Sequence, residues 1–111
     1  MCGIYSFLNH KRQGLNFENI KTEFLKGKDR GPESSSTKVI DEYDVFIGFH
    51  RLAINGYGDS EAEQPMEINN VVLICNGEIY NHKEIFHSMD VLPKSCSDCE
   101  VIIHSYLKYG I

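Results

Sequence analysis

Cys2 combines a nucleophilic side chain with a place at the start of the chain, directly after the initiator methionine. Initiator methionine is usually removed when a small residue follows, and its removal would give Cys2 a free α-amino group beside its thiol. An α-amine titrates near pH ~7.7–8.0, so it can accept the thiol proton and later give it to a leaving group. The Met-Cys start therefore predicts a nucleophile and its base on one residue, provided that other groups complete the site.

Asn76 and Gly77 are the second group with chemical potential, because they directly follow the apolar run 71–75. A side-chain amide next to a glycine N–H at a strand end supplies the donors of an oxyanion hole. Glycine also lets the backbone approach a substrate closely. The alternative interpretation is an ordinary turn, for which Asn-Gly is a strong signal.

Three charged residues would suit the charged groups of a free amino acid. Arg51 stands at a predicted strand end, where its guanidinium could hold a carboxylate through two hydrogen bonds. Glu78 and Asp98 could hold an ammonium group. The alternatives are a surface salt bridge for Arg51, a solvated loop acid for Glu78 and a helix N-terminal acid for Asp98. With Cys2 directed at a carboxamide, this set predicts an amino acid substrate that carries one.

The remaining cysteines suggest other chemistry less strongly. Cys75 lies in an apolar run and is typical of a buried core thiol, whereas Cys96 and Cys99 form a C-x-x-C pair. Zinc would need two more ligands at a similar spacing, and the sequence has no second pair. Two alternatives stay open. The first is a metal module of Cys96 and Cys99 with His82 or His87, and the second is a Cys–His pair of Cys75 or Cys96 with His50.

The elements that must position these residues follow from the apolar pattern. Predicted strands cover residues 3–8, 39–40, 45–49 and 71–75. Predicted helices cover 16–26 and 81–89, and a third helix is opened by a capping box at 97–100. Residues 28–37 and 55–65 are predicted loops. The order β, α, β-β, β, α, α indicates an α+β domain with the strands in one layer and the helices outside.

Size and charge exclude several classes of function. The chain has 111 residues, the size of one small domain, and a net charge of −5. An acidic chain is a poor partner for nucleic acid or for an anionic membrane surface. No apolar stretch approaches the ~20 residues of a membrane span, and no basic leader precedes the first apolar run. These features predict a reducing, cytoplasmic setting.

Short motifs follow one another along nearly the whole chain, from Cys2 to Gly110. They are Met1-Cys2-Gly3-Ile4, Arg30-Gly31-Pro32, Gly48-Phe49-His50-Arg51-Leu52-Ala53-Ile54, Gln64-Pro65, Asn76-Gly77-Glu78-Ile79-Tyr80-Asn81-His82 and Ser97-Asp98-Cys99-Glu100-Val101-Ile102. In this order they resemble the glutaminase domain of glutamine-hydrolysing asparagine synthetase. That domain is a class II glutamine amidotransferase of the N-terminal-nucleophile (Ntn) hydrolase superfamily.

The resemblance implies a reaction and a nucleophile. In this family the N-terminal Cys attacks the side-chain amide of L-glutamine, forms a thioester and releases ammonia, and water then frees glutamate. Cys2 matches that nucleophile, and Asn76 and Gly77 match the oxyanion hole. No metal or organic cofactor is needed for this half-reaction.

The resemblance also implies which residues bind glutamine. Arg51 matches the residue that binds the α-carboxylate, and Glu78 and Asp98 match those around the α-amine. A backbone stretch that lines the glutamine pocket is matched by Leu52, Ala53 and Ile54. The turn Arg30-Gly31-Pro32 is expected to frame the Cys2 end of the site.

The fold implied by the resemblance is a four-layer αββα sandwich, of which this chain has only a part. Residues 1–111 are therefore expected to be a single, truncated glutamine amidotransferase domain that lacks strands of the second sheet. No Ser-Gly-Gly-x-Asp-Ser-type ATP motif is present, so the ammonia would go to a separate, ATP-using synthetase chain. Glu33 and Asn55-Gly56 depart from the family's usual residues, but neither departure touches an assigned site residue.

Besides the weaker metal-module and Cys–His alternatives, two classes of function follow. The first is a glutaminase that releases ammonia for a partner synthetase. The second is an inactive fragment, or a module that binds glutamine without turnover. The missing strands favour the second class, because a sheet covered on one side leaves an apolar face that promotes aggregation or a homodimer.

Overall fold

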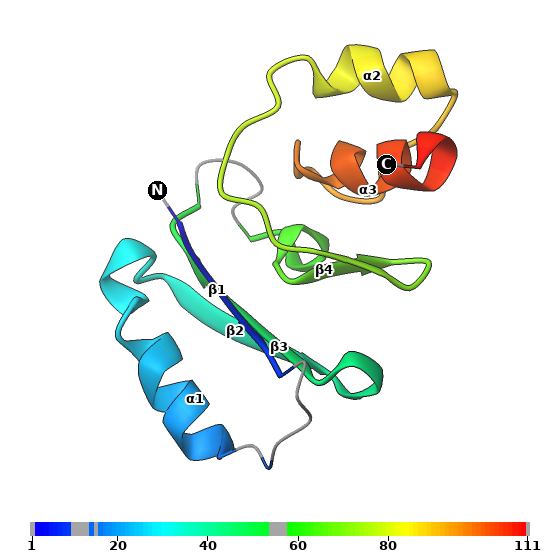
Figure 1. Cartoon of the computed structure of the whole chain (residues 1–111). Helices are drawn as coiled ribbons and strands as arrows, with labels where there is room; N and C mark the ends of the chain where they lie inside the picture. The colour runs from blue at the N-terminus through cyan, green and yellow to red at the C-terminus, as the bar shows by residue number, and fades with distance from the viewer. Residues whose placement is uncertain (1, 10–13, 15, 54–57, 111) are drawn as a thin grey trace. The chain divides into compact units, whose positions relative to one another are not determined.

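The computed structural model describes residues 2–9, 14, 16–53 and 58–110. The chain forms two compact units, residues 1–52 and 53–111. Each unit combines α-helix with antiparallel β-sheet (Figure 1), which confirms the predicted α+β class. No helix among these described residues is long and apolar enough to cross a membrane.

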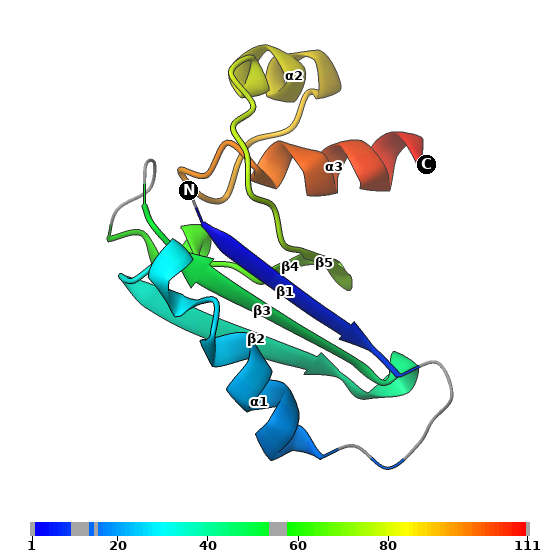
Figure 2. The same ribbon diagram turned by 60° about the vertical axis from the view of Figure 1, so that its left-hand side comes forward.

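The first unit is built on a three-stranded antiparallel sheet in the order β1-β3-β2. The strands are β1 (Gly3–Leu8), β2 (Ser34–Ile40) and β3 (Val45–Arg51), and they lie side by side in Figure 2. A tight turn, the 3-10 segment Asp41–Tyr43, joins β2 to β3. His50 of β3 lies opposite Gly3 on one side and Ser35 on the other.

The prediction of a loop over residues 28–37 was wrong for its second half. Strand β2 begins at Ser34, and only Lys28–Arg30 form a short 3-10 segment before it. A run of serines has neither the β-branched side chains nor the apolar alternation that signal a strand. Pairing of β2 with β3 along its whole length supplies the backbone hydrogen bonds that decide the conformation here.

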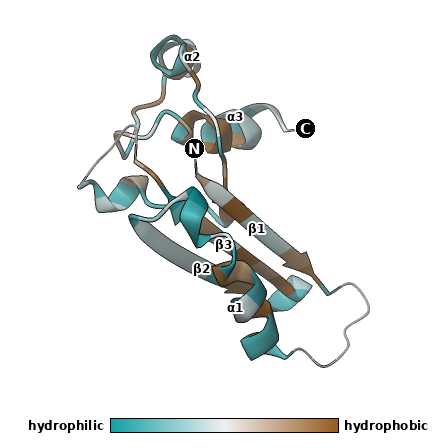
Figure 3. Cartoon of the chain, turned by 90° about the vertical axis from the view of Figure 1, so that its left-hand side faces the viewer, coloured by the Kyte–Doolittle hydropathy of each residue, from teal (hydrophilic) through white to brown (hydrophobic). Residues whose placement is uncertain are grey.

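Helix α1 (Phe17–Leu25) covers one face of this sheet, as Figures 1 and 2 show. The Asn16 side chain accepts a hydrogen bond from the Asn19 N–H at 3.2 Å and so caps the helix. The helix lies within the predicted range 16–26, to one residue at each end. Its buried side chains Ile20 and Phe24 pack with Phe46 of β3, and Tyr5 and Phe7 of β1 join them. Figure 3 shows these strands with hydrophobic residues among polar ones.

The second unit holds a hairpin and two helices. The hairpin strands are β4 (Met66–Ile68) and β5 (Val71–Leu73), and the helices are α2 (His82–Met89) and α3 (Glu100–Tyr109). The turn residues Asn69 and Asn70 both have positive φ, as a two-residue hairpin turn requires. Ile103 of α3 is packed with Met66 and Ile68, and Val101 with Phe86 and Met89.

Four expectations for the second unit need correction. Strand β4 was missed, because three residues are too few to show an alternating pattern. Strand β5 ends at Leu73 rather than Cys75, and its residues are half-buried rather than buried. The predicted capping box at 97–100 is absent, because α3 begins at Glu100 and Cys99 makes no side-chain cap. The predicted loop 55–65 contains the 3-10 segment Ser60–Ala62, and residues 54–57 lie outside the described residues.

Candidate functional site

The predicted site residues divide between the two units. The first unit carries Cys2, Arg51 and Leu52, and the second carries Ala53, Asn76, Gly77, Glu78 and Asp98. Ile54, predicted to line the glutamine pocket, lies outside the described residues, as does Met1.

The Cys2 thiol lies against the backbone of Leu52. Its Sγ is 3.4 Å from the Leu52 amide nitrogen and 3.4 Å from the Leu52 carbonyl oxygen. As a thiol it donates to the carbonyl, and in either protonation state it accepts from the N–H. An N–H directed at sulfur stabilises negative charge there, which is what a thiolate nucleophile needs. Cys2 is half-buried, immediately before β1.

The Arg30-Gly31-Pro32 turn packs against the end of β3, next to Arg51. A Cβ on Gly31 would lie 2.2 Å from the His50 carbonyl oxygen, so only glycine fits there. The Glu33 N–H then donates to the Arg51 carbonyl at 3.1 Å. This packing supports the expectation that the turn frames the Cys2 end of the site, because Gly3 pairs with the same His50.

Arg51 is the last residue of β3 and is only 7% exposed. This burial does not fit the alternative of a surface salt bridge. A buried guanidinium needs charged or polar partners, and a bound carboxylate is one that matches its planar geometry. The carboxylate-binding role of Arg51 stays a prediction.

His50 has both ring nitrogens engaged within the first unit. Nε2 is 2.8 Å from the Phe24 carbonyl oxygen, and Nδ1 is 2.7 Å from the Ser35 hydroxyl. A carbonyl only accepts, so Nε2 carries a proton, and in the neutral ring Nδ1 accepts from Ser35. A histidine held in this way has no nitrogen left to serve as a base for a cysteine. The Cys–His alternative therefore gains no support from His50.

Asn76 and Gly77 lie in the irregular segment after β5, and both are exposed. A Cβ on Gly77 would meet only the Cys75 Sγ, at 3.9 Å, and otherwise open space. The backbone of Gly77 is not loose, since its carbonyl accepts from the buried Cys99 thiol at 3.6 Å. Asn76 and Gly77 are thus exposed on a backbone held at Gly77, and their oxyanion role stays a prediction.

The two predicted ammonium-binding acids differ in their surroundings. Glu78 is exposed, whereas Asp98 is buried directly before α3. Asp98 Oδ2 accepts from the backbone N–H of Ile79 at 2.6 Å, so this carboxylate holds the residue next to Glu78. Asp98 therefore has a structural contact that the sequence did not predict.

Gln64 is a second residue that sequence reasoning missed, and its side chain accepts from the Cys75 N–H at 2.5 Å.

A pocket of about 630 Å³ opens in the second unit between α2 and the segment that leads to α3. Asp98 is the one predicted site residue among its lining residues. The polar side chains that share this lining are His82, Lys83, His87, Asp90, Ser95, Cys96 and Ser97. The pocket is therefore large enough for an amino acid-sized molecule and mixed in charge.

The C-x-x-C pair does not form a metal site in the described part of the chain. Cys96 is exposed, whereas Cys99 is buried and its thiol donates to the Gly77 carbonyl. No group of three or more His, Cys, Asp or Glu residues that could hold a metal occurs among the described residues. The Cys96 backbone N–H instead donates to Asp59 at 2.9 Å. This bond is the main cause of a pKa of Asp59 below its usual value.

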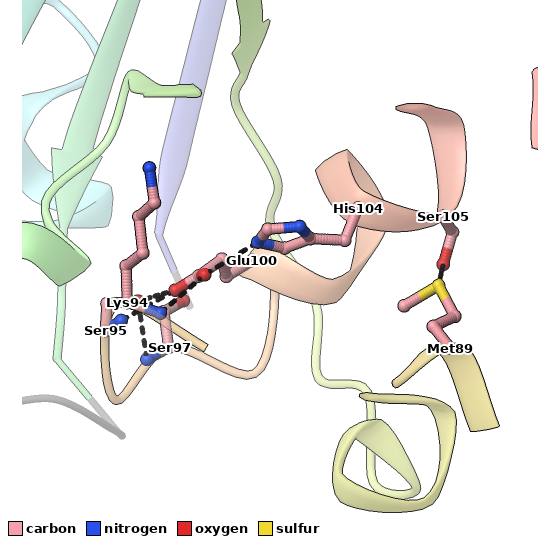
Figure 4. A network of polar contacts seen from close by, with 7 residues as sticks. All are labelled: Met89, Lys94, Ser95, Ser97, Glu100, His104 and Ser105. Atoms are coloured by element: carbon pink, nitrogen blue, oxygen red, sulfur yellow. Dashed lines mark hydrogen bonds and ion pairs between the residues drawn. The ribbon is translucent and has the colours of Figure 1, made fainter. Parts of the chain in front are cut away.

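Glu100 anchors the segment that carries Asp98. Its fully buried carboxylate accepts from the Lys94 N–H, the Ser95 N–H and hydroxyl, and His104 Nε2, at 2.6–2.9 Å (Figure 4). Burial raises the pKa of Glu100, but these hydrogen bonds lower it by more, so the net pKa lies below 4.5. This network explains why Glu100 does not form the predicted capping box.

Comparison with known proteins places the whole chain in one family. A sequence model of the glutamine amidotransferase domain matches residues 1–111. A probable asparagine synthetase (glutamine-hydrolyzing) of Acanthamoeba polyphaga mimivirus is 33% identical over 105 residues, which are 93% of this chain and 19% of the relative. The corresponding enzyme of Asparagus officinalis is 38% identical over 114 residues, covering 99% of this chain and 19% of the relative.

The relative from Bos taurus, also named asparagine synthetase (glutamine-hydrolyzing), is 31% identical over 115 residues. That alignment covers 100% of this chain and 20% of the relative, so the chain spans about a fifth of the length of these proteins. The chain belongs to the glutamine amidotransferase domain family and is related to the glutaminase part of asparagine synthetases.

Proposed function

We propose that this domain hydrolyses the side-chain amide of L-glutamine to glutamate and ammonia, with Cys2 as nucleophile. The observation that carries the proposal is the Cys2 thiol held at 3.4 Å from the Leu52 amide, beside Arg51, in a glutamine amidotransferase domain. The finer fold that goes with this function is part of an Ntn-hydrolase αββα sandwich. The two antiparallel sheets with helices are compatible with that fold.

The reaction would proceed in two steps. The Cys2 thiolate attacks the amide carbon, its α-amine gives the leaving nitrogen a proton, and ammonia departs from a tetrahedral intermediate to leave a thioester. Water then attacks the thioester, and glutamate leaves as the thiol forms again. The Asn76 amide and the Gly77 N–H would stabilise the oxyanion in both steps, because both lie exposed on a held backbone.

Binding of glutamine would use its charged end. Arg51 would hold the α-carboxylate, and Glu78 and Asp98 would hold the α-ammonium. The backbone at Leu52 and Ala53 would line the pocket. Nothing in this half-reaction calls for a metal or an organic cofactor.

The ammonia would serve a synthetase that uses ATP. The relatives are named asparagine synthetase (glutamine-hydrolyzing), and their remaining four-fifths lie outside the region matched by this chain. We therefore infer that an ATP-using synthetase domain or chain receives the ammonia. A glutamine-binding module without turnover is the competing proposal, and retention of Met1 would favour it, because the α-amine would then lie in a peptide bond.

The experiment is an assay of glutamate release from L-glutamine, with the intact mass of the same preparation. Turnover by the chain without Met1, and loss of at least about 10³-fold in Cys2→Ala, is the expected result. Cys96→Ser is the matched control, because Cys96 is an exposed thiol outside the proposed site. A folded chain that lacks Met1 and releases no glutamate would overturn the proposal and favour the binding module.

A further inference from the structure

The hairpin ladder of the second unit stops just before the proposed oxyanion donors. β5 ends at Leu73, which pairs with Met66, the first residue of β4. The same register would place Gln64 opposite Cys75. The residue between Gln64 and Met66 is a proline, which has no backbone N–H to continue the ladder. The backbone that leads into Asn76 must therefore be held in some other way.

The side chain of Gln64 supplies the missing ladder contact. Its Oε1 accepts from the backbone N–H of Cys75 at 2.5 Å. Gln64 is only 7% exposed, so bulk water does not compete for this bond, and loss of the acceptor would leave a backbone N–H unsatisfied. Cys75 directly precedes Asn76, so the bond fixes the point from which the proposed oxyanion donors emerge.

Two more side chains hold the same segment further along. The Cys99 thiol donates to the Gly77 carbonyl at 3.6 Å, and Asp98 Oδ2 accepts from the Ile79 N–H at 2.6 Å. The backbone is thus held at alternate residues, 75, 77 and 79, although it has no regular secondary structure there. Asp98 and Cys99 both lie in the turn just before α3, and they hold the far end of the segment.

We propose that Gln64 is a positioning residue that fixes the backbone of the Asn76-Gly77 oxyanion segment. The inference rests on the proposed function, since it requires these residues to donate to the reacting oxygen. Oxyanion donors lower the barrier only when they point in advance at the place where charge develops. A segment held at its far end alone would sample other directions, and the cost would fall on the chemical step rather than on glutamine binding.

The test compares Gln64→Met, which removes the acceptor at similar length, with Gln64→Glu, which keeps an acceptor oxygen. We expect Gln64→Met to lower kcat for glutamine hydrolysis by roughly tenfold to hundredfold, with KM within about threefold. Gln64→Glu should recover most of kcat. Amide hydrogen exchange measured by NMR should show faster exchange of the Cys75 N–H in Gln64→Met than in the other two proteins.

Amide exchange separates failure of this inference from failure of the proposed function. A wild-type chain that lacks Met1 and releases no glutamate overturns the proposed function. Unchanged exchange of the Cys75 N–H in Gln64→Met overturns the role of Gln64, and so does faster exchange with unchanged kcat. If Gln64→Met does not fold, Gln64→Asn takes its place, because its shorter side chain withdraws the carbonyl from Cys75 and keeps the amide. The same kcat and exchange results are then required.

Discussion

The imidazole of His50 lies flat on the ring of Phe24, with the ring centroids 4.0 Å apart and the planes at 8°. The same His50 donates from Nε2 to the carbonyl oxygen of Phe24 at 2.8 Å. One residue of β3 is therefore tied to α1 both through its ring face and through a hydrogen bond. Because Arg51 follows His50, this pair also fixes the end of β3 that carries the proposed carboxylate ligand.

His50→Phe should destabilise the chain although it keeps an aromatic ring on Phe24. The substitution removes the His50 donor from the Phe24 carbonyl, which still accepts from the Gly27 N–H at 3.0 Å, and it removes the ring acceptor of Ser35, at a cost of roughly 1–2 kcal/mol. Urea unfolding followed by circular dichroism measures this free energy. His87→Phe is the matched control, because His87 is exposed on α2 and should change stability by less than about 0.5 kcal/mol. Equal effects at the two positions would contradict the role assigned to His50.

Two glycine substitutions should have opposite consequences. A Cβ at Gly48 would lie 2.4 Å from Cε2 of the buried Phe24 ring, so Gly48→Ala should cost roughly 1–3 kcal/mol through overpacking. Gly77→Ala meets nothing closer than 3.9 Å and should leave stability within about 0.5 kcal/mol. If the proposed oxyanion binds at the Gly77 N–H, the added methyl group would crowd it, so glutamate release should fall sharply. Wild-type stability of Gly48→Ala would contradict the predicted overpacking. Wild-type activity of Gly77→Ala would contradict the predicted role of Gly77 in the oxyanion hole.

Substitutions of Glu78 and Asp98 should have different effects on kcat and KM. Glu78 is exposed and its proposed role is binding, so Glu78→Gln should raise KM for glutamine with kcat nearly unchanged. Asp98 also holds the Ile79 N–H at 2.6 Å, so Asp98→Ala should lower kcat as well. Asp98→Asn keeps an acceptor for that N–H and removes the charge, which makes it the control. If Asp98→Ala and Asp98→Asn behave alike in kcat, the contact with Ile79 does not matter for the reaction.

The sequence predicted elements that carry a local signal and missed those that depend on pairing. Helix α1 has an apolar stripe and a capping Asn16, and its predicted bounds agree with the structure to within one residue. Strand β2 is rich in serine and β4 has only three residues, so neither has an apolar pattern of its own. Pairing stabilises them, β2 with β3 and β4 with β5. Local signals also misassigned Glu100, whose buried network depends on residues 94 and 95 rather than on the helix cap.

The candidate site shows the same division. Cys2, Arg51, Asn76, Gly77, Glu78 and Asp98 were named from residue type and motif, which are visible in the sequence. The contacts that hold them were not, because Gln64 and Cys75 meet only after the hairpin has set their register. The sequence signal for this contact is Gln64-Pro65 directly before β4. It can be interpreted only once β4 and its pairing with β5 are known.

Glu100 should make stability fall as the solution becomes acidic. Its pKa in the folded chain lies below the ordinary value of 4.5, so the folded state favours the carboxylate. That contribution is fully present above about pH 4.5 and is lost as pH falls through the lower, folded-state pKa. Urea unfolding of the wild type from pH 7 to pH 3 should show this decline. Glu100→Gln should be less stable at pH 7 by about 2 kcal/mol and should decline less below pH 5.

The difference between wild type and variant isolates Glu100 from other acids that titrate in the same range. Asp59 also has a lowered pKa, through the Cys96 N–H, and it contributes equally to both proteins. Glu84→Gln provides the matched control, since Glu84 is exposed on α2. Parallel pH profiles for the wild type and Glu100→Gln would mean that the carboxylate charge is not what the Lys94, Ser95 and His104 donors stabilise. The network would then stabilise the fold through packing and neutral hydrogen bonds rather than through the charge of Glu100.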